Sequence, residues 1–214
     1  MNTARLNQSH YIQINAKMST KFYHNNLEDI EIQIWELLSH SATSANSPFH
    51  QGVFASINNN IPEQRTVILR NANKSEKTLS FNTDIRSLKI EQLKINDFIS
   101  WLFYDKTLKV QLRIYAKAII HIGDFVAETA WEKSRLSSKI CYTTQRKPGS
   151  FINEPEFVEV NQTDVEPELL SFARNNFAVV ETKIHAVDFV FLNRKGNKRA
   201  YFDYESNIFQ WRQV

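Results

Sequence analysis

Apolar and polar residues alternate with a period of two near both ends of this chain, and that pattern constrains the fold most. The segments that read as strands are 53–57, 65–70, 78–82, 98–104, 110–120, 179–192, 199–204 and 208–214. Helical periodicity occupies 27–39, 85–95, 123–133, 138–144 and 165–175, the last with Asp164 as its cap. Because helices and strands do not alternate regularly, the pattern favours an α+β fold, a mainly antiparallel β-barrel with peripheral helices, over a doubly wound sheet.

The length of 214 residues suits one domain, which we place at 27–214 behind a polar N-terminal tail, 1–26. Hydrophobic residues make up 42% and charged residues 23%, which is typical of a soluble globular protein. No apolar run approaches the roughly 18 residues of a membrane span, and none resembles a signal peptide. We therefore expect a cytoplasmic protein that does not bind membranes.

A net charge of +3 is too mild to predict nucleic-acid binding, for which a concentrated basic stripe is expected. The single cysteine, Cys141, excludes an intrachain disulfide and a four-cysteine zinc site, and we expect it to be a buried apolar residue. With only four glycines in the chain, asparagines are the expected residues at left-handed turn positions.

The segment 83–89, Thr-Asp-Ile-Arg-Ser-Leu-Lys, is the most informative local feature. Asp84 is a good N-cap, so the helix is predicted to begin at Ile85. Arg86 and Lys89 then lie at the end of the helix where a cation is unfavourable, by roughly 0.3–1 kcal/mol each. An anion bound beside Ser87 would reverse that sign, and a phosphate is the natural candidate. The alternative is that both cations point into solvent.

Two further strands carry polar groups that suit such a site. In 65–70, Val67 and Leu69 share one face, whereas Arg65 and Arg70 stand at the two ends, where either guanidinium would reach an anion if the strand neighbours the helix start. In 110–120, Gln111 and Arg113 share a face of an otherwise apolar strand. A glutamine there would hydrogen-bond a planar heterocycle, or simply water at a sheet edge.

Four motifs in order, Arg65-Thr-Val-Ile-Leu-Arg70, Phe81-Asn-Thr-Asp84, Arg86-Ser-Leu-Lys89 and Gln111-Leu-Arg113-Ile, resemble the pyridoxamine 5'-phosphate oxidase superfamily. The similarity is greatest to an FMN-binding branch with the patterns R-T-V-x-L-R, T-D-x-R-S-x-K and Q-x-R-I. It extends over about 49–149 and resumes more weakly at 187–189 and at Trp211.

This resemblance implies a split β-barrel that binds FMN in a cleft between the two subunits of a homodimer. It places Arg65 near the phosphate, with main-chain groups around Val67 and Ile68 facing the flavin. The full set of cofactor-binding residues that it implies is Arg65, Thr66, Val67, Ile68, Arg70, Asn82, Thr83, Arg86, Ser87, Lys89, Gln111 and Arg199.

The chain departs from the oxidase pattern at several of its positions. Leu88 stands where the oxidase has a second basic residue, for which Arg86 is a possible replacement, and Arg70 stands where it has a lysine. For the substrate phosphate the oxidase uses a tyrosine, an arginine and a serine; this chain offers Trp131, Arg135 and Ser138. The stretch 197–202 contains no histidine where the oxidase has one over the substrate ring. Flavin binding is thus better supported than oxidation of pyridoxamine phosphate.

Other kinds of site are disfavoured. The six histidines form no close pair at metal-ligand spacing, so no metal is expected. No nucleophile elbow, dinucleotide fingerprint or phosphate-binding P-loop occurs.

The first hypothesis is an FMN-dependent oxidoreductase that acts on a small-molecule substrate. The second is a carrier or sensor that binds FMN, another phosphate-bearing cofactor or haem without turnover. A split-barrel scaffold that has lost its ligand and acts through dimerisation ranks last.

Overall fold

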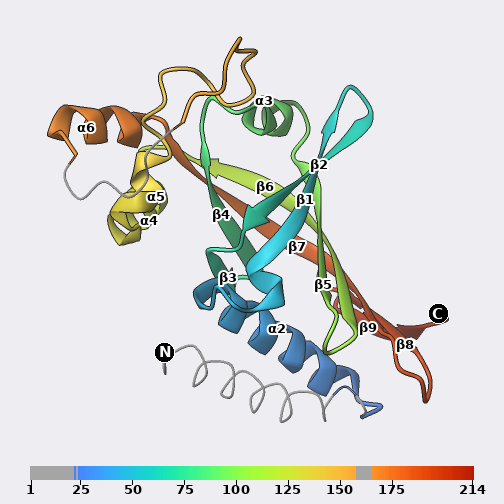
Figure 1. Cartoon of the computed structure of the whole chain (residues 1–214). Coiled ribbons are helices and arrows are strands. Elements are labelled where there is room, and N and C mark those ends of the chain that lie inside the picture. The colour runs from blue at the N-terminus through green and yellow to red at the C-terminus, as the bar shows by residue number, and fades with distance from the viewer. Residues whose placement is uncertain (1–21, 23, 158–164) are drawn as a thin grey trace.

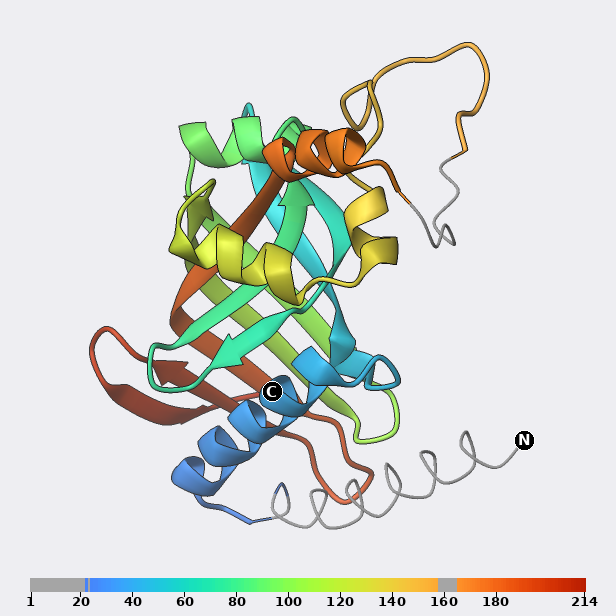
Figure 2. The ribbon, with the colours of Figure 1, turned by 90° about the vertical axis from the view of Figure 1, so that its left-hand side faces the viewer.

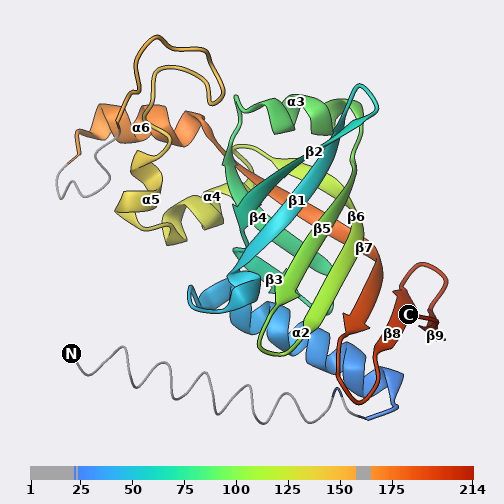
Figure 3. The ribbon, with the colours of Figure 1, turned by 45° about the vertical axis from the view of Figure 1, so that its right-hand side comes forward.

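A computed structural model describes residues 22, 24–157 and 165–214. In this part of the chain nine strands form one sheet, in which every neighbouring pair that is described runs antiparallel. The strand order is β2-β1-β5-β6-β7-β4-β3, and β8 and β9 continue from β7. The strands are β1 (Gln51–Asn58), β2 (Ile61–Ile68), β3 (Asn71–Asn73), β4 (Thr78–Asp84), β5 (Phe98–Asp105), β6 (Val110–His121), β7 (Phe177–Phe191), β8 (Lys198–Asp203) and β9 (Ile208–Arg212). The sheet curls into an open barrel (Figures 1 and 3), which confirms the α+β class.

The helices lie around this barrel. They are α2 (Leu27–Thr43), the short 3-10 helix η2 (Pro48–His50), α3 (Leu88–Ile95), α4 (Phe125–Lys133), α5 (Leu136–Ile140) and α6 (Pro167–Asn175). Helix α2 crosses the lower end of the barrel in Figure 1, α3 lies at the upper end, and α4 to α6 form a separate layer on the side of β4. None of the described helices is long and apolar enough to cross a membrane.

Aromatic rings fill the barrel interior. Phe54, Phe81 and Trp101 make mutual edge-to-face contacts, and Trp101 stacks on Phe103 at a centroid distance of 5.5 Å. Gly52 of β1 lies against this stack, because a Cβ at Gly52 would stand 2.5 Å from the Phe103 ring. The glycine is therefore required by a close approach of backbone to ring, and its φ is not in the left-handed region.

Helix α2 is fixed by polar contacts as well as by its buried apolar face. Glu31 is buried and forms ion pairs with Lys74 (3.0 Å) and Lys77 (2.8 Å), both in the turn between β3 and β4. The Trp35 indole donates to the Tyr204 hydroxyl at 3.0 Å, next to the β8–β9 turn. These contacts join three segments that lie far apart in the sequence.

Asparagines occupy three of the five left-handed non-glycine positions among the described residues, as predicted, whereas Lys77 and Lys109 occupy the other two. Asn59 and Asn60 connect β1 to β2 with φ angles of 48° and 66°, and Asn207 has a φ of 54°. Two successive left-handed residues give the tight hairpin turn that matches strand twist, which asparagine tolerates better than most residues.

The structure corrects several predicted boundaries. Helix α3 begins at Leu88 with Ser87 as its N-cap residue, since Asp84 still pairs with Phe177 in the sheet. The predicted connection at 71–74 contains the short strand β3, and α5 begins two residues earlier than expected and ends at Ile140. Helix α6 begins at Pro167 after Glu166. The predicted cap, Asp164, lies outside the described residues, as does most of the tail.

Two residues differ from their predicted environments. Phe22, within the predicted tail, is fully buried, with its ring 5.4 Å from that of Phe189. The prediction for Cys141 was wrong, because its side chain is exposed directly after the short helix α5, where its thiol donates to the Ser137 carbonyl.

Candidate functional site

Three side chains at the junction of β4 and α3 form a polar cluster, which we call the cradle: Thr83, Ser87 and Lys89. The Lys89 ammonium donates to the Thr83 Oγ1 at 3.0 Å and to the Ser87 Oγ at 3.1 Å. Both hydroxyl side chains are buried, and their oxygens are 3.4 Å apart. The Ser87 hydroxyl makes no capping hydrogen bond to α3, and of the first-turn N–H groups the one of Ile90 donates to the Ser87 carbonyl at 2.9 Å.

The electrostatics of the cradle favour an anion. No described carboxylate lies within ion-pair distance of the Lys89 ammonium. Burial lowers the pKa of Lys89 below its ordinary value, and the nearby Arg65 guanidinium lowers the pKa further, against a smaller opposing effect of Asp84. A half-buried cation that has only hydroxyl partners and a second cation nearby lacks a counter-charge.

Arg65 reaches this region from β2, where it is held by its neighbours. Its guanidinium donates to the Ser56 Oγ at 2.5 Å and to the Gln92 Oε1 at 3.1 Å, and it pairs with Glu63 at 3.2 Å. Burial lowers the pKa of Arg65, while Glu63 partly restores it. Gln92 belongs to α3, so this network fixes β2 to the helix that carries Lys89.

A cleft of about 640 Å³ lies on the other side of β4, between the barrel and the α4–α5 layer. Four of the predicted site residues line it: Arg70, Asn82, Arg135 and Ser138. Ser80 and Asn82 point to this cleft from β4, whereas Leu79 and Phe81 alternate toward the core. The cradle and the cleft thus lie on opposite faces of one strand.

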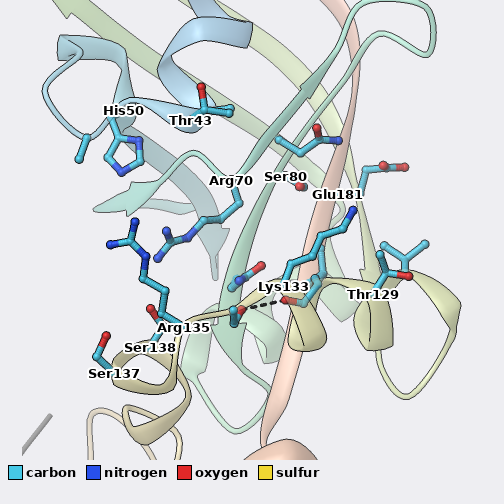
Figure 4. A pocket seen from close by; sticks show the side chains of 18 of the residues that line it. Thr43, His50, Arg70, Ser80, Thr129, Lys133, Arg135, Ser137, Ser138 and Glu181 are labelled. Atoms are coloured by element: carbon cyan, nitrogen blue, oxygen red, sulfur yellow. Dashed lines mark hydrogen bonds between the residues drawn. The ribbon is translucent and has the colours of Figure 1, made fainter. Parts of the chain in front are cut away.

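Cations dominate the cleft. Figure 4 shows Arg70 and Arg135 extending from facing walls with their guanidinium groups pointing toward one another, while Lys133 reaches toward Ser80 and Glu181. No described carboxylate forms an ion pair with any of these three cations. Two guanidinium groups that face each other without an acid have the charge and the donors that suit an anion.

Two predicted residues occupy other places. Arg86 pairs with Asp84 and with main-chain carbonyls of the loop after α5, so its nitrogens face away from the cradle. Trp131 is buried against Phe177 and Tyr142 and does not line the cleft. The tyrosine position of the oxidase pattern is therefore core in this chain.

Thr66, Val67 and Ile68 belong to β2, which forms one edge of the sheet. Val67 packs against the core and Thr66 is exposed, as the alternation predicts. An edge strand leaves every second N–H and C=O without a strand partner, so main-chain groups here are available to a ligand.

Gln111 and Arg199 lie far from the cradle within one chain. Both are opposite Val190 on β7, whereas Thr83 is opposite Ala178. At about 3.3 Å per residue, these two positions are separated by roughly 40 Å of strand. One chain therefore holds two separate sets of the predicted cofactor residues.

Arg199 of the second set binds Asp188, a buried residue that the sequence analysis included in the resemblance at 187–189 without giving it a role. Its carboxylate accepts from Arg113 at 2.7 Å and from Arg199 at 2.7 and 3.0 Å, and Arg212 lies 3.8 Å away. The Arg113 Nε is buried without a partner among the described residues. The strand alternation that placed Gln111 and Arg113 on one face was the available signal.

Sequence reasoning also missed Lys133, Glu181 and His50 in the cleft. The His50 Nδ1 lies 2.7 Å from the Ser41 carbonyl, which can only accept, so Nδ1 carries the hydrogen and Nε2 is the acceptor in the neutral ring. Lys133 is two residues before Arg135, which was the one sequence clue to its position. No group of three or more potential metal ligands occurs among the described residues.

The uncompensated lysine, two buried hydroxyls and a helix N-terminus at the cradle fit the phosphate of a nucleotide cofactor. The fold is a split barrel with peripheral helices, and comparisons with known proteins agree with it and indicate FMN as the ligand.

Residues 32–122 match the family model of the pyridoxamine 5'-phosphate oxidase FMN-binding domain. A "pyridoxine/pyridoxamine 5'-phosphate oxidase 2" of Arabidopsis thaliana is 27% identical over 179 residues, which cover 78% of this chain and 87% of that protein. Residues 32–122 are thus similar to an FMN-binding domain related to pyridoxamine 5'-phosphate oxidase, and the cofactor of this domain is FMN.

Solved structures support the fold. A pyridoxamine 5'-phosphate oxidase-related, FMN-binding protein of Nostoc punctiforme superposes with a TM-score of 0.64 at 17% identity, covering 85% of this chain and 94% of that one. PhzG of Burkholderia lata, solved with tetrahydrophenazine-1-carboxylic acid, gives a TM-score of 0.57 at 13% identity, covering 77% and 81%.

Proposed function

We propose that this flavoprotein is an FMN-dependent oxidoreductase that holds the FMN phosphate in the cradle and a small anionic substrate in the cleft. The observation that carries the proposal is the half-buried Lys89, whose described partners are two hydroxyls and no carboxylate. A dianionic phosphate supplies the missing counter-charge and accepts the hydrogen bonds that these groups donate.

The chain's own residues have distinct tasks in this proposal. Lys89, Ser87 and Thr83 bind the phosphate, and Arg65 adds positive charge to it. Main-chain groups of Thr66, Val67 and Ile68 on the edge strand β2 orient the flavin. Bound FMN supplies the hydride-accepting chemistry, while the protein supplies binding, orientation and electrostatics.

The cleft supports an anionic substrate. Arg70 and Arg135 face each other across it, and Ser138 on the first turns of α5 adds a hydroxyl. Glu181, near Lys133, is the carboxylate of the cleft lining and gives it one site for a positively charged or hydrogen-bond-donating group. Phosphate monoesters and carboxylates of small ring compounds have the charge and size that this arrangement selects.

A homodimer accounts for the separation of the two residue sets. Gln111 and Arg199 are too far from the cradle to reach the same FMN within one chain. A second subunit that presents its own Gln111 and Arg199 to the first subunit's cradle satisfies both sets. Leu102 and Tyr104 of β5, next to Gln111 and Arg113 on the barrel's outer face, are exposed and suit such an interface.

The test of cofactor binding uses the difference between FMN and riboflavin, which lacks the phosphate. We expect Lys89→Ala to weaken FMN binding about tenfold or more, as for a lost charge-assisted hydrogen bond, and Ser87→Ala to weaken it less. Riboflavin affinity, measured by flavin fluorescence, serves as the control and should change little. Wild-type protein that binds riboflavin as tightly as FMN would contradict the proposed cradle.

A second candidate function is flavin binding without turnover. Two observations favour it: the oxidase tyrosine is replaced by the buried Trp131, and the stretch 197–202 has no histidine. Steady-state assays with pyridoxine and pyridoxamine 5'-phosphates, and with NAD(P)H and an electron acceptor, separate the candidates. Robust flavin-dependent turnover of any of these excludes the non-catalytic function.

A further inference from the structure

Arg86 lies between the cradle and the cleft wall, and its guanidinium is held in one orientation. Its Nε donates to the Asp84 Oδ1 at 3.0 Å and its Nη2 donates to the Asp84 Oδ2 at 2.7 Å. Asp84 is buried, and the ion pair raises the pKa of Arg86. Such a two-point contact fixes the plane of the guanidinium as well as its position.

The remaining edge of the guanidinium reaches the segment that follows α5. Nη1 donates to the carbonyl oxygens of Thr144 at 2.9 Å and of Gln145 at 3.3 Å. The Phe172 ring of α6 lies 5.7 Å from the guanidinium carbon. Every nitrogen of Arg86 is therefore engaged by the chain itself, and none is directed at a ligand.

Neighbouring contacts join the same two parts of the molecule. The Ile85 N–H donates to the Asn176 carbonyl at 2.8 Å, and the Asn176 side-chain amide donates to the Tyr142 carbonyl at 3.0 Å. The β4–α3 turn is thereby attached at successive points to the loop after α5 and to the end of α6.

The contacts of Arg86 connect the cradle to the α5 wall of the cleft. Thr83 and Ser87, which supply the two hydroxyls of the cradle, flank the Asp84–Arg86 pair. Helix α5, whose loop Arg86 holds, carries Ser138 and is preceded by Arg135, both on the cleft wall. A shift of the Arg86 contacts would move the cradle and the cleft wall relative to each other.

We propose that Arg86 is a positioning residue that sets the distance between the cradle and the α5 wall of the cleft, so that both anion sites depend on it. The inference rests on the proposed function, because it takes the FMN phosphate to occupy the cradle and an anionic substrate to occupy the cleft. Lysine cannot replace Arg86, since a single ammonium cannot bind both Asp84 oxygens and two carbonyls with fixed geometry.

The experiment measures two affinities in the full-length protein. The first is the preference for FMN over riboflavin, which reports the cradle alone. The second is the affinity of the FMN-loaded protein for phenyl phosphate, a ring-bearing phosphate monoester that probes the cleft. A purely structural role would lower thermal stability and weaken FMN and riboflavin alike, leaving their ratio unchanged.

We expect Arg86→Gln to reduce the FMN preference and the phenyl phosphate affinity about tenfold each, the usual effect of losing a charge-assisted contact. Arg86→Lys should not restore either value. Arg146→Gln is the matched control, since Arg146 is exposed in the same loop region and pairs with Glu156 at 3.2 Å; it should change neither.

The outcomes are distinguishable. Wild-type protein without FMN preference, or without phenyl phosphate binding, overturns the proposed function and the inference with it. Wild-type protein with both properties, together with an Arg86→Gln variant that retains either one, overturns the inference alone. If Arg86→Gln does not fold, Asp84→Asn/Arg86→Gln removes both charges and gives the same two readouts.

Discussion

At the scale of single residues, Lys89 is the group whose protonation depends most on a bound ligand. Its pKa is lowered from 10.5 by burial and by Arg65, so the folded protein binds this proton less tightly than the unfolded chain does. Between the lowered pKa and 10.5, the unfolded state therefore binds more protons, and this group's contribution to the free energy of unfolding rises with pH. A bound phosphate raises the pKa of Lys89 again, since it stabilises the ammonium form.

Because the phosphate binds the charged form of Lys89, we expect FMN affinity to fall as pH rises through the lowered pKa of Lys89, in a window that begins below 10.5. The measurement is the FMN dissociation constant, from flavin fluorescence, between neutral pH and about pH 10. Lys89→Arg should retain its charge and abolish the decline, because the guanidinium stays protonated there.

Riboflavin provides the control for that pH profile. Its affinity should not follow the Lys89 titration, because it has no phosphate, although the flavin ring itself titrates near the upper end of the range. An FMN profile that coincides with the riboflavin profile would refute the assignment of Lys89 to the phosphate.

At the scale of elements, Asp188 joins four strands through arginines. It belongs to β7, and its partners Arg113, Arg199 and Arg212 come from β6, β8 and β9. The carboxylate is 1% exposed and the three arginine side chains are 27–40% exposed. Three cations around one buried acid therefore add to the pairing of β8 with β7 in holding the β8–β9 hairpin against the barrel.

Asp188→Asn should therefore lower the free energy of unfolding by about 2–4 kcal/mol, since it leaves three guanidinium groups without their counter-charge. Chemical denaturation of the variant measures the change. Glu205→Gln, in the exposed turn of the same hairpin, makes the same change in charge and should cost less than about 0.5 kcal/mol. Equal effects of the two variants would show that the cluster contributes nothing beyond net charge.

The elements also show which parts of the structure a sequence can predict. Strands were predictable because alternation of apolar residues reflects a buried and an exposed face, as in β6 and β7. The start of α3 was not predictable, because pairing with β7 keeps Asp84 in strand β4 and the Asp84 carboxylate binds Arg86. Local propensity contains no information about either partner.

The candidate site likewise has one part that the sequence could predict and one part that it could not. Thr83, Ser87 and Lys89 are close in sequence, so their convergence was predictable from one motif. Arg70 and Arg135 meet only because the layer formed by α4 and α5 folds back over β4, and no local pattern encodes that contact. Trp131 shows that a matching sequence position does not ensure the same role. It stands where the oxidase pattern has a ligand-binding tyrosine, whereas its own ring is buried in the core.

At the scale of the whole molecule, β7 separates the two sets of proposed cofactor residues. Thr83 is opposite one end of β7, and Gln111 and Arg199 are opposite the other, roughly 40 Å of strand away. A rigid strand in the middle of a sheet cannot bring its own ends together. The proposed homodimer agrees with this geometry, because the assignment of Arg199 to the FMN site requires a second copy to place it beside a cradle.

Mixed dimers test that arrangement directly. We expect Lys89→Ala and Arg199→Ala each to weaken FMN binding as homodimers, because every site then lacks one contributor. In a dimer of one Lys89→Ala and one Arg199→Ala subunit, one site loses both residues and the other retains both. Differentially tagged mixed dimers should therefore bind about one FMN tightly, half the wild-type number, as measured by flavin titration. If Arg199 acts within its own chain, no mixed dimer can contain an intact site, and tight binding will be absent from the mixture.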